Sequence, residues 1–257
     1  MKNKILSGKN ILVTGTARGM GRQMVETFAE MSANVFAHAR KFTEQHADYC
    51  KEIADKFDTK IIPVYFELTN ADEIKRGISE IRATKIPVNG LVNNAGITFN
   101  ALFQMTTMED VRNQFEVNFF APFLLTQYIV KLMIRNKSGS IVNISSSAAL
   151  DGNSGKSAYG SSKAALLCMT RCLSEELAAN GIRANAICPG VTETDMVATM
   201  PDYAVNLQLE STFLGKFGKV SDIANVAAFL LSDYSSYITG QFIRVDGGVT
   251  EYGKRQS

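Results

Sequence analysis

The sequence predicts one α/β domain in which a mostly parallel, seven-stranded sheet is doubly wound, with helices on both faces. Short apolar runs alternate with longer amphipathic stretches along the whole chain, which is the pattern of strands joined by crossover helices. The runs are apolar almost throughout rather than at every second position, as expected for strands covered on both sides. The chain has 257 residues, and α/β folds of this length commonly form a single domain, here 1–257.

Seven apolar runs are the expected strands. The third contains Pro63, and because proline cannot donate a hydrogen bond to the ladder, this strand should lie at an edge of the sheet. The third strand is an edge in a doubly wound sheet, which gives the expected order 3-2-1-4-5-6-7. In chain order the runs are Asn10–Thr14, Asn34–Ala39, Lys60–Leu68, Gly90–Asn93, Ser140–Ser145, Arg183–Cys188 and Gln241–Asp246.

Six longer stretches with helical periodicity separate the strands. The least regular part of the chain is Thr192–Lys219, after the sixth strand, with short helices expected within Met196–Phe213. Because ligands bind at the carboxyl ends of strands in such sheets, we expect this region to cover the substrate as a lid, the alternative being an ordinary surface loop. The six expected helices are Met20–Met31, Thr43–Phe57, Ala71–Thr84, Met108–Asn136, Ala158–Asn180 and Val220–Leu231.

Composition argues against several classes of function. The formal net charge is +2, which provides no field for binding nucleic acid or a membrane surface. No apolar run approaches the ~20 residues that span a bilayer, and the N-terminus lacks a signal-peptide core, so a cytoplasmic protein is expected. The four cysteines form no CxxC pair, and His38 and His46 lack the neighbouring ligands that a zinc site requires, so no metal is expected.

A glycine-rich loop follows the first strand and leads directly into a helix. Gly15 allows a tight turn, Gly19 lets the backbone approach a pyrophosphate, and Gly21 allows the helix to pack closely on the strand. The N-terminus of the helix offers free N–H groups and partial positive charge to the phosphates. This is the context of a Rossmann-type dinucleotide site, with the expected residues Gly15, Thr16, Ala17, Arg18, Gly19, Met20 and Gly21.

The end of the second strand indicates NADP(H) rather than NAD(H). An NAD site has an acidic residue there, which binds the ribose hydroxyls, whereas this chain has Arg40 followed by Lys41. Arg18 in the loop can reach the same place, and two guanidinium groups can bind a 2′-phosphate through charge-assisted bonds. The alternative is that Arg40 and Lys41 merely begin a solvated helix.

Tyr159 and Lys163 are the candidate proton-transfer pair. Their spacing of four places both on one helical face, and an ammonium beside a phenol lowers the pKa of the phenol towards neutrality. Ser146 follows the fifth strand, at the edge of the sheet where its hydroxyl can hold a substrate oxygen. Asn118 lies within a long apolar helix, where a buried amide needs a reason.

These motifs, taken in order, resemble the classical short-chain dehydrogenases/reductases. The resemblance spans nearly the whole chain, from TGTARGMG, NNAG and the helical Asn118 through Ser146, YGSSK and PGVTET to the final VDGG. It implies that Tyr159 is the general acid in reduction and that Ser146 orients the carbonyl. It also implies that Lys163 binds the ribose and lowers the tyrosine pKa, and that Asn118 supports a proton-relay water. Further implied cofactor contacts are Glu67 (usually an aspartate in the family), Leu68, Asn94, Ala95, Gly96, Pro189, Gly190, Thr192 and Thr194.

Three segments, Glu193–Met196, Asp222–Asp233 and Tyr237–Gly248, most resemble the 3-oxoacyl-[acyl-carrier-protein] reductases. That resemblance implies NADPH-dependent reduction of a 3-oxoacyl thioester. An acyl carrier protein is the corresponding partner; Lys137 matches one basic docking position and Asn180 occupies the other. Two alternatives stay open. One is another oxidoreductase of the family, acting on a sugar, a secondary alcohol or a secondary-metabolite ketone, and the other is a non-catalytic NADP-binding module.

The resemblance also implies a homotetramer. The stretches Met108–Asn136 and Ala158–Asn180 carry apolar residues on more than one face, and a helix that is apolar all round is buried in a core or against a partner. We therefore expect a symmetric assembly built through these two helices.

Overall fold

The sheet has seven strands in the order β3-β2-β1-β4-β5-β6-β7, and every neighbouring pair is parallel. The predicted fold class and strand order are therefore confirmed. The structure is a computed structural model that describes residues 4–193, 206 and 209–248. Its strands are β1 (Asn10–Val13), β2 (Asn34–Ala39), β3 (Ile61–Tyr65), β4 (Gly90–Asn93), β5 (Gly139–Ile144), β6 (Ile182–Pro189) and β7 (Phe242–Val245).

The strand that contains the proline is an edge strand, as predicted. Pro63 lies in the middle of β3, opposite Ala37 of β2, and β3 is the last strand on its side of the described sheet. An edge strand tolerates the missing N–H because one side of its ladder has no partner strand. The strand is shorter than the predicted run Lys60–Leu68, since the chain leaves the sheet after Tyr65.

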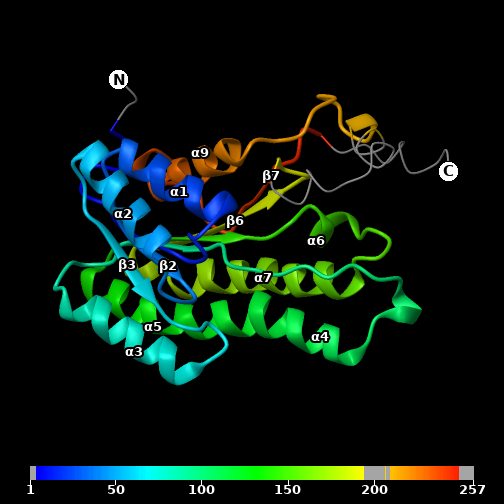
Figure 1. Ribbon diagram of the computed structural model, residues 1–257, viewed down its shortest axis with the longest axis horizontal. Coiled ribbons are helices and arrows are strands. Elements are labelled where there is room, and N and C mark those ends of the chain that lie inside the picture. The colour runs from blue at the N-terminus through cyan, green and yellow to red at the C-terminus, as the bar shows by residue number, and fades with distance from the viewer. Residues whose placement is uncertain (1–3, 194–205, 207–208, 249–257) are drawn as a thin grey trace.

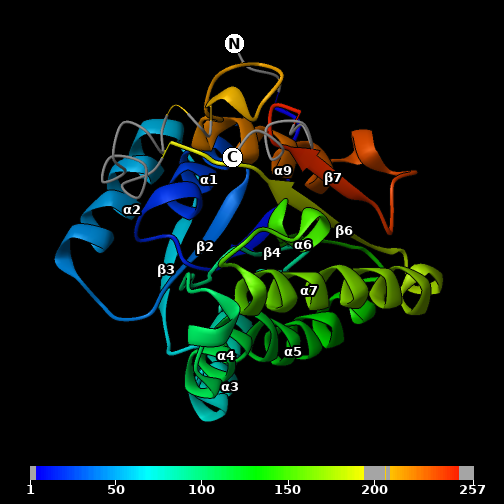
Figure 2. The ribbon, with the colours of Figure 1, turned by 90° about the vertical axis from the view of Figure 1, so that its right-hand side faces the viewer.

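Helices cover both faces of the sheet (Figure 1). One face carries α1 (Gly19–Glu30), α2 (Glu44–Phe57) and α9 (Val220–Leu231). The opposite face carries α3 (Ala71–Ala83), α4 (Met108–Phe115), α5 (Ala121–Asn136) and α7 (Ser157–Glu176). A short helix that was not predicted, α6 (Ala148–Asp151), lies beside the first turns of α7, at the strand-end side of the sheet (Figure 1 and Figure 2).

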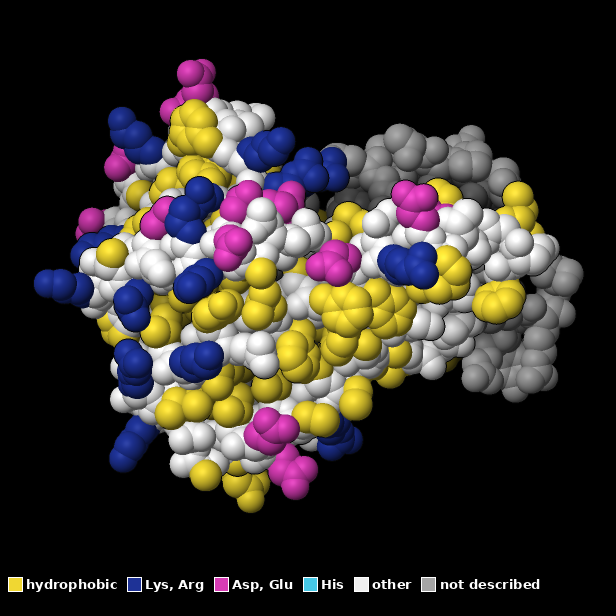
Figure 3. Space-filling model, turned by 90° about the horizontal axis from the view of Figure 1, so that it is seen from below, with side chains coloured by type: hydrophobic (Ala, Val, Ile, Leu, Met, Phe, Trp, Pro, Cys, Tyr) yellow, Lys and Arg dark blue, Asp and Glu magenta, His cyan; other side chains and the backbone are white. Residues whose placement is uncertain are grey.

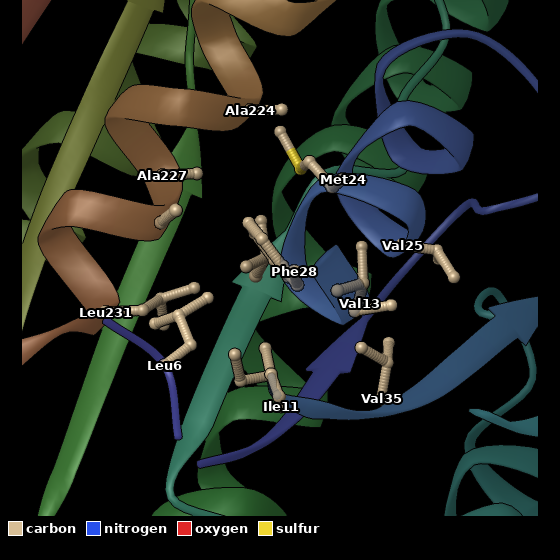
Figure 4. Close-up of a cluster of buried hydrophobic side chains, with 14 of the residues drawn as sticks. Leu6, Ile11, Val13, Met24, Val25, Phe28, Val35, Ala224, Ala227 and Leu231 are labelled. Carbon is tan, nitrogen blue, oxygen red and sulfur yellow. The ribbon is translucent and has the colours of Figure 1, made fainter. Parts of the chain in front are cut away.

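Two apolar cores hold these layers together. In the core shown in Figure 4, Phe28 and Met24 of α1 lie between the sheet and the small side chains Ala224 and Ala227 of α9. All four side chains are fully buried. Burying a side chain as large as Phe28 stabilises the fold by about 1.5–3 kcal/mol. The second core joins the other face of the sheet to α3 and α5.

The long helix predicted over Met108–Asn136 is present but not uniform. A π-helical segment, η2 (Glu116–Phe120), separates α4 from α5, and Asn118 lies in its middle. By length and composition the whole stretch could cross a membrane. Leu125 and Met133 are nevertheless fully buried within the core beside the sheet, so this is a core helix of the domain.

The irregular region after the sixth strand is described only in part. Its two ends are held together by a parallel bridge between Thr192 and Gly218. The short helices expected within Met196–Phe213 lie largely outside the described residues, and so does Thr194.

Candidate active site

The carboxyl ends of the strands bring the predicted catalytic residues together. Ser146 follows β5, and Tyr159 lies in the first turn of α7, with α6 between them in the sequence. Gly160 allows this approach, because a Cβ there would lie 2.9 Å from the carbonyl oxygen of Ala148 in α6. The Ser145 hydroxyl also donates to the carbonyl oxygen of Lys163 at 2.8 Å, which ties the end of β5 to α7.

The side chains of Tyr159 and Ser146 lie close enough for a hydrogen bond between their hydroxyl groups. Burial raises the pKa of the Tyr159 phenol above its usual value, and the hydrogen bond with Ser146 acts in the opposite direction. A hydrogen bond that lowers this pKa favours the phenolate, so in that state the Ser146 hydroxyl is the donor. Both side chains are half-buried, which leaves them within reach of a substrate.

Lys163 lies deeper than Tyr159 and is only 3% exposed. Its ammonium donates to the carbonyl oxygen of Ile144, the last residue of β5, at 2.9 Å. Burial lowers the pKa of Lys163 to about 8. The expected lowering of the tyrosine pKa by Lys163 is not the dominant effect in this structure, since the ammonium is directed at a backbone carbonyl and burial controls the phenol.

Asn118 links the loop after β4 to α7. Its side-chain oxygen accepts from the N–H of Ile97 at 2.9 Å, and its amide group donates to the Ile97 carbonyl at 2.9 Å and to the Ser162 hydroxyl at 3.0 Å. Ser162 in turn donates to the carbonyl oxygen of Tyr159 at 2.7 Å. The buried amide therefore has a structural reason: it holds the first turn of α7 against the loop that begins at Gly96.

Lys156 is a residue of the site that the sequence reasoning missed. Its ammonium lies 5.5 Å from the centre of the Tyr159 ring, close enough for a cation–π contact. Burial lowers the pKa of Lys156, and no described carboxylate forms an ion pair with it. The signal was available, because a lysine three residues before the tyrosine, here at the N-cap of α7, lies within one turn of it.

The glycine-rich loop has the conformation that its sequence predicts. Gly15 and Gly19 have φ values of +73° and +57°, in the left-handed region that favours glycine. A Cβ on Gly21 would overlap the carbonyl oxygen of Gly15, so the close approach of α1 requires glycine. Asn94 supports the loop from β4, since its amide donates to the carbonyl oxygen of Thr14 at 2.8 Å.

The residues present fit a nicotinamide dinucleotide. No side chain caps the N-terminus of α1, where Arg18 is the N-cap residue, so its N–H groups can bind a phosphate. At the other end of the site Gly96 packs closely on two side chains, because a Cβ there would lie 3.1 Å from both Asn118 Oδ1 and Lys163 Nζ. A dinucleotide bound at the N-terminus of α1 would extend along the carboxyl edge towards Tyr159.

The expected 2′-phosphate site contains three exposed cations. Arg18, Arg40 and Lys41 are exposed, and Arg40 Nε lies 3.8 Å from a carboxylate oxygen of Glu67. The other Glu67 oxygen accepts from the N–H of Thr69 at 3.2 Å. The Glu67 carboxylate thus partly neutralises the positive charge of Arg40.

The remaining predicted cofactor contacts follow the ends of the other strands. Gly190 follows β6 and donates its N–H to the Val245 carbonyl oxygen at 3.0 Å. The Thr192 hydroxyl donates to the carbonyl oxygen of Gly190 at 3.2 Å, and Thr194 lies outside the described residues. The other predicted contacts lie in the loop after β1, in the first turn of α1, after β3, after β4 and at the end of β6, and are Thr16, Ala17, Met20, Leu68, Ala95 and Pro189.

Both histidines lie beside the phosphate loop, which the sequence did not reveal. His38 is in β2 and His46 is in α2, and both are buried. Among the described residues, no group of three or more histidine, cysteine, aspartate or glutamate side chains is placed to hold a metal ion.

Comparisons with known proteins show which family the chain resembles along nearly its whole length. The family profile described as enoyl-(acyl carrier protein) reductase matches residues 15–250. The chain is 38% identical to the 3-oxoacyl-[acyl-carrier-protein] reductase FabG of Thermotoga maritima, over 95% of this chain and 98% of that protein. The FabG of Aquifex aeolicus has the same identity and coverage. A solved structure assigned as a gluconate dehydrogenase of Agrobacterium tumefaciens has a TM-score of 0.91 and 30% identity, covering 96% of this chain and 98% of its own.

Replacing Lys163 by methionine should stabilise the fold. At pH 7 the buried lysine is charged, and a pKa lowered to about 8 corresponds to a cost of roughly 3 kcal/mol. The lost hydrogen bond to Ile144 offsets about 1 kcal/mol of that cost. We expect Lys163→Met to raise the free energy of unfolding at pH 7 by roughly 1–3 kcal/mol, measured by denaturant titration.

The gain should depend on pH in a defined direction. Because the native-state pKa lies below that of the unfolded chain, the wild type gains stability as pH rises from about 8 to 10.5, and the difference should narrow there. Lys75→Met, at an exposed position on α3, is the control and should show no such dependence. A Lys163→Met protein no more stable than wild type at pH 7 would contradict the conclusion that the buried Lys163 ammonium destabilises the fold.

Proposed function

The chain belongs to the short-chain dehydrogenase/reductase family, and from that premise we propose that it uses NADPH to reduce 3-oxoacyl thioesters to 3-hydroxyacyl thioesters. As a member of this family it is an oxidoreductase that acts on an alcohol or carbonyl group with a nicotinamide cofactor. The observation that carries the proposal is the convergence of Tyr159, Ser146 and the buried Lys163 at the carboxyl edge of the sheet. Relatives that are 38% identical over almost the full length are named as 3-oxoacyl reductases.

Two hydroxyl groups would act on the substrate oxygen. Tyr159 and Ser146 both donate to it, and as negative charge develops on that oxygen Tyr159 transfers its proton. The raised pKa of Tyr159 keeps the phenol protonated at neutral pH, which suits an acid in reduction. When bound, the reduced nicotinamide supplies the hydride for the carbonyl carbon. The Ser146 hydroxyl then stabilises the phenolate until a proton returns.

Lys163 and Asn118 would support this transfer without contacting the carbonyl. Lys163 places a positive charge one helical turn from Tyr159 and beside Gly96, where a cofactor ribose would lie. Asn118 fixes the Ile97 backbone and Ser162, and so holds the first turn of α7. We propose a water beside Asn118 as the route by which the proton returns.

Exposed apolar side chains next to the site favour an acyl substrate. The loop after β4 presents Ile97, Phe99 and Leu102 with 43%, 50% and 49% of each residue exposed, and α6 presents Leu150. The Ala101 N–H donates to the Gly155 carbonyl oxygen at 3.0 Å, which brings this loop to the segment before α7. An acyl chain would bury these side chains, at about 25 cal/mol per Å².

The second candidate is an oxidoreductase for a hydroxy acid or its oxo form. The cation that favours it is Lys156, which lies beside the Tyr159 ring without a carboxylate partner among the described residues. An anionic group two or three bonds from the reacting carbonyl would pair with it. The similar solved structure is assigned as a gluconate dehydrogenase, an enzyme named for a hydroxy acid.

The proposed substrate is the 3-oxoacyl thioester, whether free or bound to a carrier protein. Lys137 follows the C-terminus of α5, and Asn180 follows that of α7. Because α7 has 20 residues, these positions lie about 30 Å along the helix from Tyr159 of the same chain. A carrier protein bound there would serve the site of another subunit, so free and carrier-bound thioesters need separate assays.

A substrate panel tests this function. Purified protein is given NADPH with an acetoacetyl thioester, free and carrier-bound, an enoyl thioester, keto-sugars, oxo acids and simple ketones. We expect kcat/KM to be highest, on the order of tenfold, for the 3-oxoacyl thioester. A preference for oxo acids would support the second candidate instead, and NADPH binding without turnover of any substrate would favour a non-catalytic module.

Tyr159→Phe is the matched variant for the same panel. It should keep the affinity for NADPH and lower turnover of the best substrate by roughly 10²–10⁴-fold, since only proton transfer is lost. Turnover above about a tenth of wild type would contradict Tyr159 as the acid.

Cofactor preference is tested at Arg40. We propose that Arg18 and Arg40 bind the 2′-phosphate, so Arg40→Asp should weaken NADPH binding by roughly 10–100-fold and leave NADH nearly unchanged. The measurement is the Kd of each cofactor by fluorescence titration. Arg40→Gln is the control and should show a smaller loss, since it adds no repulsive charge. An equal loss for both cofactors would show that Arg40 supports the fold instead.

We further propose a homotetramer built through α4, α5 and α7. The face in Figure 3 carries a broad band of hydrophobic side chains between charged ones. On this side of the molecule Met108, Phe120 and Phe123 are 60%, 52% and 44% exposed. Exposed apolar area of this kind marks an interface.

A charge placed in this face should break the assembly. We expect the wild type to sediment as a tetramer and Phe123→Glu as a smaller species. Ser79→Glu, which adds the same charge at an exposed position on α3, should leave the mass unchanged. A monomeric wild type would refute the assembly.

A further inference from the structure

The chain has two histidines, and the proposed chemistry uses neither. His38 lies in β2 and His46 in the first turn of α2, and the side chains are 1% and 3% exposed. The first two residues of the phosphate loop are their partners: Gly15 is hydrogen-bonded to His38, and Thr16 to His46. Buried imidazoles on a ligand-binding loop need an explanation.

The hydrogen bonds of His38 define its protonation state. The N–H of Gly15 donates to Nδ1 at 3.3 Å, so Nδ1 carries no proton, and Nε2 lies 2.8 Å from the carbonyl oxygen of Phe66, which can only accept. His38 is therefore neutral, with its proton on Nε2. Burial lowers the pKa of His38 to about 4, which agrees.

The hydrogen bonds of His46 define the same tautomer. The Thr16 hydroxyl donates to the carbonyl oxygen of His38 at 3.0 Å, so at 2.8 Å it accepts from Nε2 of His46. Nδ1 of His46 then accepts from the Tyr65 hydroxyl at 3.2 Å. One chain of hydrogen bonds therefore runs from Tyr65 through His46 to Thr16. A second runs from Gly15 through His38 to the carbonyl oxygen of Phe66.

We propose that His38 and His46 are positioning residues that hold Gly15 and Thr16 in the conformation that binds the cofactor. The inference rests on the proposed function in that it takes the loop to be the cofactor site. Gly15 has a φ of +73°, and a free loop would sample other conformations at this residue. The His38 bond fixes the Gly15 N–H, and the His46 bond fixes the Thr16 side chain. Cofactor affinity, rather than turnover, should therefore depend on Nδ1 of His38 and on Nε2 of His46.

Amide substitutions can test each nitrogen separately. An asparagine side chain places its oxygen near the position of Nδ1, and a glutamine side chain places its amide nitrogen near that of Nε2. At His38 the loop is held through Nδ1, so His38→Asn should keep the affinity for NADPH and His38→Gln should lose it. At His46 the loop is held through Nε2, so the order reverses: His46→Gln should keep the affinity and His46→Asn should lose it.

The expected result is this crossed pattern in the Kd for NADPH. The two failing variants should bind about tenfold more weakly, because each leaves a group of the loop without its buried partner, and kcat at saturating cofactor should stay within about twofold. Each variant is the control for the other at its position. Equal losses in all four, no loss in any, or the reverse order would overturn the proposal.

A second measurement does not depend on turnover or on the variants. In the tag-free protein without cofactor, ¹⁵N spectra of the imidazoles contain two ring systems, and both should show the neutral Nε2–H tautomer at pH 7. A charged ring or an Nδ1–H tautomer at either position would overturn the proposal. If the wild type shows the expected tautomers and binds NADPH but the four variants lack the crossed pattern, this inference alone is refuted. A wild type that binds no nicotinamide cofactor refutes the proposed function and this inference together.

Discussion

The parallel ladder between neighbouring strands is the interaction on which the rest of the structure depends. Because every pair in the sheet is parallel, all seven strands end at one edge, and the loops that follow them meet there. Residues far apart in sequence, such as Gly15, Asn94, Ser146 and Gly190, therefore lie along a single edge. Helices on both faces keep this sheet dry, and they also make each connection long enough to place a new loop at that edge.

Helix positions at this edge are held by buried polar groups rather than by apolar packing alone. Asn93 at the end of β4 donates to Thr126 of α5 at 3.0 Å and to Asn143 of β5 at 2.8 Å. Asn143 in turn donates to Thr170 of α7 at 2.8 Å. These side-chain hydrogen bonds join α5, β4, β5 and α7 in one chain. Apolar contacts allow elements to shift past one another, whereas a hydrogen bond requires its donor and acceptor at fixed positions. This chain of hydrogen bonds therefore fixes the register of α5 and α7 against the strands.

The two ends of the site balance stability and function differently. At the end with Tyr159, burial raises the pKa of Tyr159 and lowers that of Lys163, so the fold bears the cost of a buried ammonium. At the end where we propose that the adenosine binds, the buried ionisable groups beside the loop are two histidines, and the cations Arg18 and Arg40 remain exposed. With the proposed function, such a site would bind charge where water can still screen it and would exclude water where a proton moves.

The sequence by itself determined the fold class, the strand order and the positions of Ser146, Tyr159 and Lys163. It could do so because strands buried on both faces are apolar throughout and a proline marks an edge, and because the order and spacing of the motifs resemble a known family. The π-helical segment at Asn118 could not be predicted, since α-helical and π-helical turns share the same apolar periodicity over a few residues. The hydrogen bonds of Thr16 with His38 and His46, and the aim of Lys163 at the Ile144 carbonyl, were decided only by the tertiary structure. Each of these contacts joins residues from different strands and helices, and only packing brings those elements within the 3 Å that a hydrogen bond requires.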